Sequence, residues 1–140
     1  MKNIAEIDLV ILSENHKEGE KVSKFLKSCS KSEECLRIVP KYWICGKENQ
    51  FEIKDNMLLV IYADSKSEFD KLKGELKHFS KIKHRFLLSD KEEARTWATE
   101  CPDLALKVFV GMKDDTLSDF RAAIRTSVPS PNISAGVKNY

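Results

Sequence analysis

The sequence has few glycines and no glycine-rich loop. Only five glycines occur in 140 residues, and none forms a GxGxxG or GxxxxGK(S/T) pattern. Such loops need glycine so that backbone amides can face a phosphate. The loop after the first predicted strand, residues 13–20 (SENHKEGE), has one glycine and three carboxylates, which would repel phosphate. The sequence therefore argues against Walker-type and dinucleotide binding, and we expect no cofactor.

Long apolar runs and a strong charge of one sign are also lacking. A membrane span needs about 20 mostly apolar residues, whereas the mean hydropathy here is -0.41 and the apolar runs are short. With 24 Lys+Arg against 22 Asp+Glu, the net charge is only +2, and the pI of 8.3 lies below the value of about 9 typical of nucleic-acid-binding domains. The charged start, MKNIAEID, has no signal-peptide core. We expect a cytoplasmic protein that neither inserts into membranes nor binds nucleic acid.

The four cysteines do not suggest a metal site. Cys29, Cys35, Cys45 and Cys101 form no CxxC pair and have no histidine at ligand spacing. We expect reduced thiols that serve as small apolar side chains, and no metal.

What the sequence does contain is an alternation of strand and helix patterns. Apolar runs predict strands at residues 7–13, 36–45, 57–63, 85–88 and 104–110, with a short return at 51–53. Helical spacing covers residues 17–28, 67–79, 92–101 and 115–124, with Ser89–Glu92 resembling a capping box. This order predicts a three-layer α/β domain over residues 1–128, with about six mostly parallel strands and helices on both faces. Residues 129–140 have no periodic apolar pattern and are expected to form a disordered tail or linker.

One connection breaks the regular pattern. Between Cys45 and Met57 there is no room for a crossover helix. We therefore expect part of residues 36–53 to pair antiparallel at one edge of the sheet, where Pro40, which lacks an amide donor, is tolerated.

No set of residues is convincing as a catalytic centre. Glu14, Asp64 and Lys113 occupy positions of a phospho-receiver site, but the acidic pair that such a site needs is incomplete. The basic stretch 77–85 reads as a solvated face, with an acidic partner as the alternative.

The second half of the chain resembles Ras-like small GTPases, in particular the Rab branch. Residues 58–64 (LLVIYAD) followed by 67–72 (SEFDKL) resemble the fourth strand and third helix of that family. The nucleotide motifs depart from the family: Glu18-Gly19-Glu20 replaces Gly-Lys-Ser/Thr, residues 89–91 replace Asn-Lys-x-Asp, and residues 111–113 keep only the lysine. The resemblance implies a pseudo-GTPase without nucleotide, which is not an enzyme and acts by binding other proteins.

A looser resemblance is to the N-terminal domain of the alpha- and gamma-adaptin-binding protein family. It rests on Trp43-Ile44 with Lys47, and on the Ala94-x-x-Trp97 pattern. It implies help in assembling clathrin-adaptor complexes in vesicle trafficking, with adaptor-complex subunits or a second copy of the chain as partners.

The candidate interface lies where Ras-like proteins place their partner-reading switch region. Aromatic side chains anchor interfaces when they are exposed, and the alternative is that these aromatics are core. The candidate residues are Pro40, Tyr42, Trp43, Ile44, Lys47, Glu48 and Phe51.

Residues 59–68 also resemble a Toll/interleukin-1-receptor-like (TIR-like) interaction domain of a signalling adaptor, although Phe69-Asp70 replaces that family's Trp-Cys and its Arg-Asp-x-x-Pro-Gly loop is absent. An antiparallel edge strand would favour the Ras-like reading, and an all-parallel sheet of five strands would favour the TIR-like one. The third alternative is an enzyme, either a residual GTPase or an NAD hydrolase. For NAD cleavage the expected glutamate position holds Lys73, with Glu75 two residues later, so we expect no activity.

Overall fold

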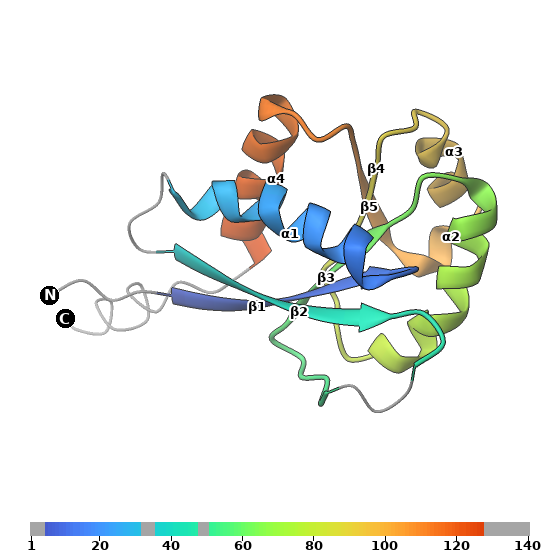
Figure 1. Ribbon diagram of the computed structural model, residues 1–140, viewed down its shortest axis with the longest axis horizontal. Coiled ribbons are helices and arrows are strands. Elements are labelled where there is room, and N and C mark those ends of the chain that lie inside the picture. The colour runs from blue at the N-terminus through green and yellow to red at the C-terminus, as the bar shows by residue number, and fades with distance from the viewer. Residues whose placement is uncertain (1–4, 32–35, 48–50, 128–140) are drawn as a thin grey trace, which may run out of the picture.

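The computed structural model describes residues 5–31, 36–47 and 51–127, which form one α/β unit (Figure 1). Its five strands are all parallel and lie in the order β2-β1-β3-β4-β5. The elements are β1 (Ala5–Ser13), α1 (His16–Lys31), β2 (Leu36–Ile44), β3 (Leu58–Tyr62), α2 (Lys66–Lys73), the 3₁₀ helix η1 (Gly74–Phe79), β4 (Arg85–Ser89), α3 (Ala94–Thr99), the 3₁₀ turn η2 (Pro102–Leu104), β5 (Leu106–Val110) and α4 (Asp114–Ser127).

The sheet buries both of its faces, as its continuous apolar strands predict. All five residues of β3 are buried. Helices α1 and α4 cover one face, where Phe120 packs with Phe86 and Phe109. Helices α2, η1 and α3 cover the other face, where Phe69 stacks on Trp97. The α/β class with helices on both faces is confirmed.

The predicted antiparallel edge strand is wrong. Strand β2 runs parallel to β1 over its whole length, from the pair Ala5↔Leu36 to Ser13↔Ile44. The described part of the connection after β2 has no strand, so the described residues form five strands and not six. Residues 45–57 can span roughly 40 Å when extended, which exceeds the length of a nine-residue strand, about 30 Å. The described part of this connection contains no helix, and its side chains Phe51 and Ile53 pack on the second face.

Two predicted helix signals also take a different form. The predicted helix 67–79 divides at Gly74 into α2 and η1, and Ser65 caps α2 by accepting a hydrogen bond from the Glu68 amide (3.1 Å). The predicted capping box does not form, because Ser89 is the last residue of β4 and its Oγ accepts from the Lys91 amide. Helix α3 begins five residues later, at Ala94.

The parallel order brings the carboxyl ends of all five strands to one edge of the sheet, which is where ligands bind in such folds. The loops at this edge follow Ser13, Ile44, Tyr62, Ser89 and Val110. The predicted tail, residues 129–140, lies outside the described residues. Among the described helices, none combines the length and the apolar character needed to cross a membrane.

Candidate functional site at the carboxyl edge of the sheet

The turn from β1 into α1 is held by side-chain hydrogen bonds. Ser13, fully buried, donates from Oγ to the Asn15 carbonyl (2.8 Å), and Asn15 Oδ1 accepts from the Glu18 amide (3.0 Å). A Cβ at Gly19 would lie 2.9 Å from Tyr42 Cδ1 and 3.1 Å from Ser13 Oγ. Only glycine allows this close approach, which sets the first turn of α1 directly against β1 and β2.

A hydrogen-bond network centred on Tyr62 joins three elements of this edge. The Tyr62 hydroxyl lies 2.8 Å from Asp64 Oδ2 and 3.2 Å from Asp90 Oδ2, and it accepts from Lys21 Nζ (3.1 Å). Asp64 Oδ1 accepts from the Asp90 amide (3.1 Å). Burial, and then the hydrogen bond and charge of Asp64, raise the pKa of Tyr62 well above its ordinary value. The network therefore holds a neutral tyrosine between two carboxylates and ties α1 to the loops after β3 and β4.

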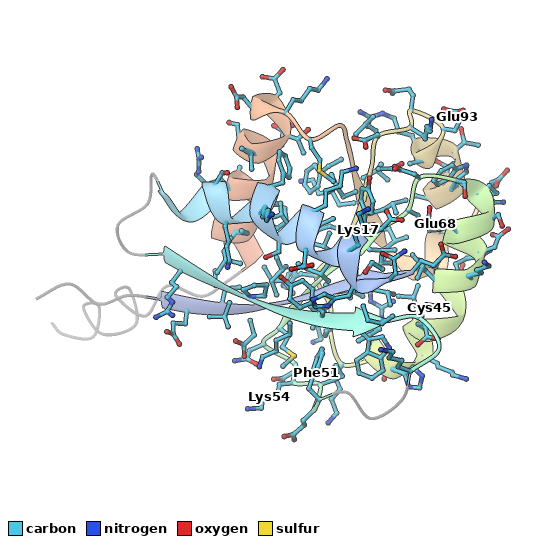
Figure 2. All side chains as sticks on the ribbon, in the orientation of Figure 1. Lys17, Cys45, Phe51, Lys54, Glu68 and Glu93 are labelled. Carbon is cyan, nitrogen blue, oxygen red and sulfur yellow. The ribbon has the colours of Figure 1, made fainter. Side chains whose placement is uncertain are left out.

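A second group of carboxylates lies between α1 and α2. Oxygens of Glu14, Glu18 and Glu68 all lie within 4.8 Å of one another, close enough to share a cation. Two of these groups already have protein partners: Lys71 Nζ donates to Glu14 (3.0 Å), and Glu68 Oε1 accepts from the Asp64 amide (3.0 Å). We therefore do not treat the three residues as metal ligands. Glu68 extends from α2 toward the first turn of α1, which Lys17 marks in Figure 2.

The candidate phospho-receiver set is not assembled as one centre. Glu14 pairs with Lys71, and both Asp64 oxygens accept hydrogen bonds within the Tyr62 network. Lys113 lies beside Gly111, at the end of β5.

The described thiols are poor candidates for a nucleophile. Burial, and then the charge of Glu75, raise the pKa of the Cys45 thiol, which disfavours the reactive thiolate. Cys45 and Cys101 are both free and partly buried, while the side chains of Cys29 and Cys35 lie outside the described part. Lys73 stands at the position where the NAD-hydrolase alternative expects a glutamate, and its ammonium lies 3.1 Å from Asp70. Glu75, two residues later, accepts a hydrogen bond from the indole of Trp43.

The predicted interface residues divide between core and surface. Trp43 is buried, its Nε1 donates to Glu75 Oε1 (2.9 Å), and its ring packs against Phe51 and Phe79. For Trp43, the alternative that it is core is therefore confirmed. The partly exposed members are Pro40, Tyr42, Ile44 and Phe51, Lys47 is exposed, and Glu48 lies outside the described residues.

Within the basic stretch, Arg85 has a structural role. Arg85 donates to the carbonyls of Phe79 (3.1 Å), Ile82 (3.0 Å) and Leu104 (3.4 Å). These bonds fix the entry to β4, so Arg85 is a positioning residue of the fold. The other basic residues are exposed, as expected of a solvated face, although the ring of His78 also packs against Trp43, with centroids 5.3 Å apart. They are Lys77, His78, Lys81, Lys83 and His84.

The sequence patterns assigned no role in a site to Tyr62 or Glu68, and Glu18 entered only as a departure from a phosphate-binding motif. Tyr62 ends an otherwise aliphatic strand, and a hydroxyl at that position needs a partner when it is buried. That signal was available in the sequence. The approach of Glu18 to Glu68 depends on how α1 and α2 pack, which no local pattern contains.

Comparison with known protein-family models gives no match, and comparison with curated proteins gives none either.

Proposed function

We propose that this chain is a protein-binding module without enzymatic activity, and that its partner binds along the outer side of β2 and the residues that follow it. The observation that carries the proposal is the position of β2 as an outermost strand. Its residues Pro40, Tyr42 and Ile44 are partly exposed, and Phe51 lies beside them in the connection, partly exposed and packed on Trp43.

The chemistry of this surface supports a protein partner. An outermost strand carries main-chain groups along its free side that can pair with another chain. Pro40 has no amide and interrupts such pairing, so we assign recognition mainly to side chains. Lys41 Nζ lies 5.9 Å from the centre of the Phe51 ring, which places a charge beside an aromatic anchor.

The carboxyl edge supports the non-enzymatic part of the proposal. Its tyrosine, two aspartates and Lys21 are bonded to one another. The Cys45 thiol is held in its protonated form by its raised pKa. These contacts support a structural role for the edge.

The sheet order supports the TIR-like alternative over the Ras-like one. An all-parallel sheet of five strands is the feature expected of the TIR-like reading, and the antiparallel strand expected of the Ras-like reading is replaced by a parallel β2. A role in adaptor-complex assembly rested on the Ras-like resemblance and has no support from the topology. Since many doubly wound domains share the order 2-1-3-4-5, the fold alone does not fix the partner.

The proposal can be tested by reversing charge in the segment of the chain that follows β2. We expect Lys47→Glu combined with Glu48→Lys to reduce retention of the proteins captured by the wild-type chain about tenfold, measured by quantitative mass spectrometry of pull-downs, because charge at an interface rim steers and selects partners. Lys107→Glu on β5, the other outermost strand, is the matched control. Equal retention by both variants would place the interface elsewhere.

The enzyme alternatives have a separate test. Calorimetry with GTP and an NAD-loss assay on the purified protein are both expected to give no signal. Clear GTP binding or NAD turnover would replace the proposed function by a residual GTPase or an NAD hydrolase.

A further inference from the structure

We propose that the carboxyl groups of Glu18 and Glu68 share one proton, so that an acid–carboxylate hydrogen bond joins α1 to α2 and is lost when that proton leaves. This inference goes beyond the proposed function, because it makes the carboxyl edge of the sheet sensitive to pH.

The first observation is an unsatisfied acceptor. Glu68 Oε1 accepts from the Asp64 amide, but Oε2 is buried and, within the described part of the chain, receives no hydrogen bond. A buried carboxylate oxygen without a donor is costly. Glu18 is the neighbouring side chain that supplies a donor when it carries a proton, since carboxyl oxygens of the two residues lie within 4.8 Å of each other.

The second observation is the position of Glu18. Its backbone is fixed by the Asn15 cap, and its side chain is half-buried at the start of α1. Burial, and then the charge of the neighbouring Glu68, raise the pKa of Glu18 above its ordinary 4.5. The unsatisfied Glu68 oxygen and the electrostatics therefore point to the same protonated form of Glu18.

The other charges around the pair favour this arrangement only in part. On the side of α1, Lys21 opposes the shift, but its ammonium is shared with the Tyr62 hydroxyl and Asp90. From the loop after β3, Asp64 adds to the negative charge. On the remaining side, Glu14 and Lys71 pair with each other at 3.0 Å. The negative charges near Glu18 therefore outweigh the positive charge that is not already paired with another group.

The sign of the pH dependence follows from the raised pKa. Below about 4.5, the ordinary value, Glu18 is protonated in the folded and the unfolded chain alike. Above it, the unfolded chain releases the proton first, so the folded form loses relative stability as pH rises through the folded-state pKa of Glu18. Two repelling carboxylates then separate α1 from α2.

Side-chain ¹³C titration by NMR tests the shared proton directly. We expect the midpoint of Glu18 to lie above 4.5 and to move down in Glu68→Gln, which removes the neighbouring charge but retains an acceptor for the Asp64 amide. In Glu93→Gln, an exposed glutamate before α3 (Figure 2), the midpoint should stay in place. A Glu18 midpoint at or below its ordinary value, or one that ignores Glu68→Gln, would overturn the proposal.

Thermal unfolding of Glu18→Gln gives an independent readout. The carboxamide is neutral and donates to Glu68 whatever the state of a carboxyl group at position 18. We therefore expect the melting temperature to equal that of the wild type at pH 4 and to exceed it by about 2–4 °C once the pH has passed the Glu18 midpoint found by NMR. The same increase on both sides of that midpoint, or none above it, would show that the pair shares no proton.

Discussion

Two clusters of side chains stabilise the fold by different means. One is the Tyr62 network, and the other is an aromatic corner that consists of Trp43, Phe51, His78 and Phe79. In the network, one hydroxyl, two carboxylates and one ammonium group are joined by hydrogen bonds of 2.8–3.2 Å. In the corner, three rings surround Trp43 with centroid distances of 4.9–5.3 Å, and the indole makes one hydrogen bond, to Glu75.

The two clusters should therefore respond differently to truncation of a side chain and to a change of pH. Ring packing depends on contact area and on shape, and it changes little with pH or salt. Hydrogen bonds among charged groups depend on which protons are present and on how far water reaches the group. Truncation should therefore damage the corner most, and titration should damage the network.

The largest effect is expected from Trp43→Ala. The substitution leaves a cavity among Phe51, His78 and Phe79 and should lower the free energy of unfolding by about 3–5 kcal/mol. Urea denaturation at pH 8 and pH 9 should give the same loss at both values. Trp43→Phe keeps part of the packing and removes the bond to Glu75, so the difference between its cost and that of Trp43→Ala measures how much the corner owes to its rings. A strongly pH-dependent loss in Trp43→Ala would contradict the comparison.

A smaller effect is expected from Tyr62→Phe. Removing the hydroxyl takes a partner from Asp64, Asp90 and Lys21 and should cost about 1–2 kcal/mol at pH 7, measured by urea denaturation. Tyr42→Phe is the matched control, because Tyr42 contacts His16 through its ring, which phenylalanine keeps. Its change should stay within about 0.5 kcal/mol. Equal costs for the two variants would show that the network adds nothing.

The dependence of stability on pH above about 10 tests the role of Tyr62. Because its pKa is raised in the folded chain, the unfolded chain ionises first, and stability should fall as pH rises above about 10. Tyr62→Phe should remove much of this fall. Ultraviolet titration of the folded wild type and of Tyr62→Phe should show, by difference, that Tyr62 stays protonated well above its ordinary pKa of about 10.

The elements could be predicted from the sequence because their signals are local. The run 57–63 became β3 (Leu58–Tyr62), and the helix predicted from residue 67 begins one residue earlier, as α2 at Lys66. Gly74, with its low helix propensity, is also a local signal for the point where α2 ends and the 3₁₀ helix η1 begins. Whether the chain continues there as an α-helix or as a 3₁₀ helix depends on the packing of the residues that follow.

The direction of β2 and the composition of the site could not be predicted in the same way. A connection of residues 45–57 without helical periodicity fits either a hairpin or an extended return, and only its packing on the second face selects the latter. The Tyr62 network likewise depends on sheet order, which brings Asp64 and Asp90 together from adjacent strands β3 and β4. Strand neighbours far apart in sequence are set by the global packing of helices and not by any one segment.

The smallest effects, and of opposite sign, are expected from alanine at two helical glycines. At Gly74, φ -64° and ψ -22° suit any residue and no atom lies within 4 Å of a new Cβ, so Gly74→Ala should stabilise the chain by about 0.5–1 kcal/mol.

At Gly19 the gain in helix propensity is similar, but the new Cβ meets Tyr42 and the Ser13 hydroxyl. Ser13 is fully buried and bonded to the Asn15 carbonyl, so it has little freedom to move. We expect Gly19→Ala to lower the free energy of unfolding by about 1 kcal/mol net. If both variants were stabilising in thermal unfolding, the carboxyl edge would be as open as the end of α2, and its tight approach of α1 to β1 would have no energetic consequence.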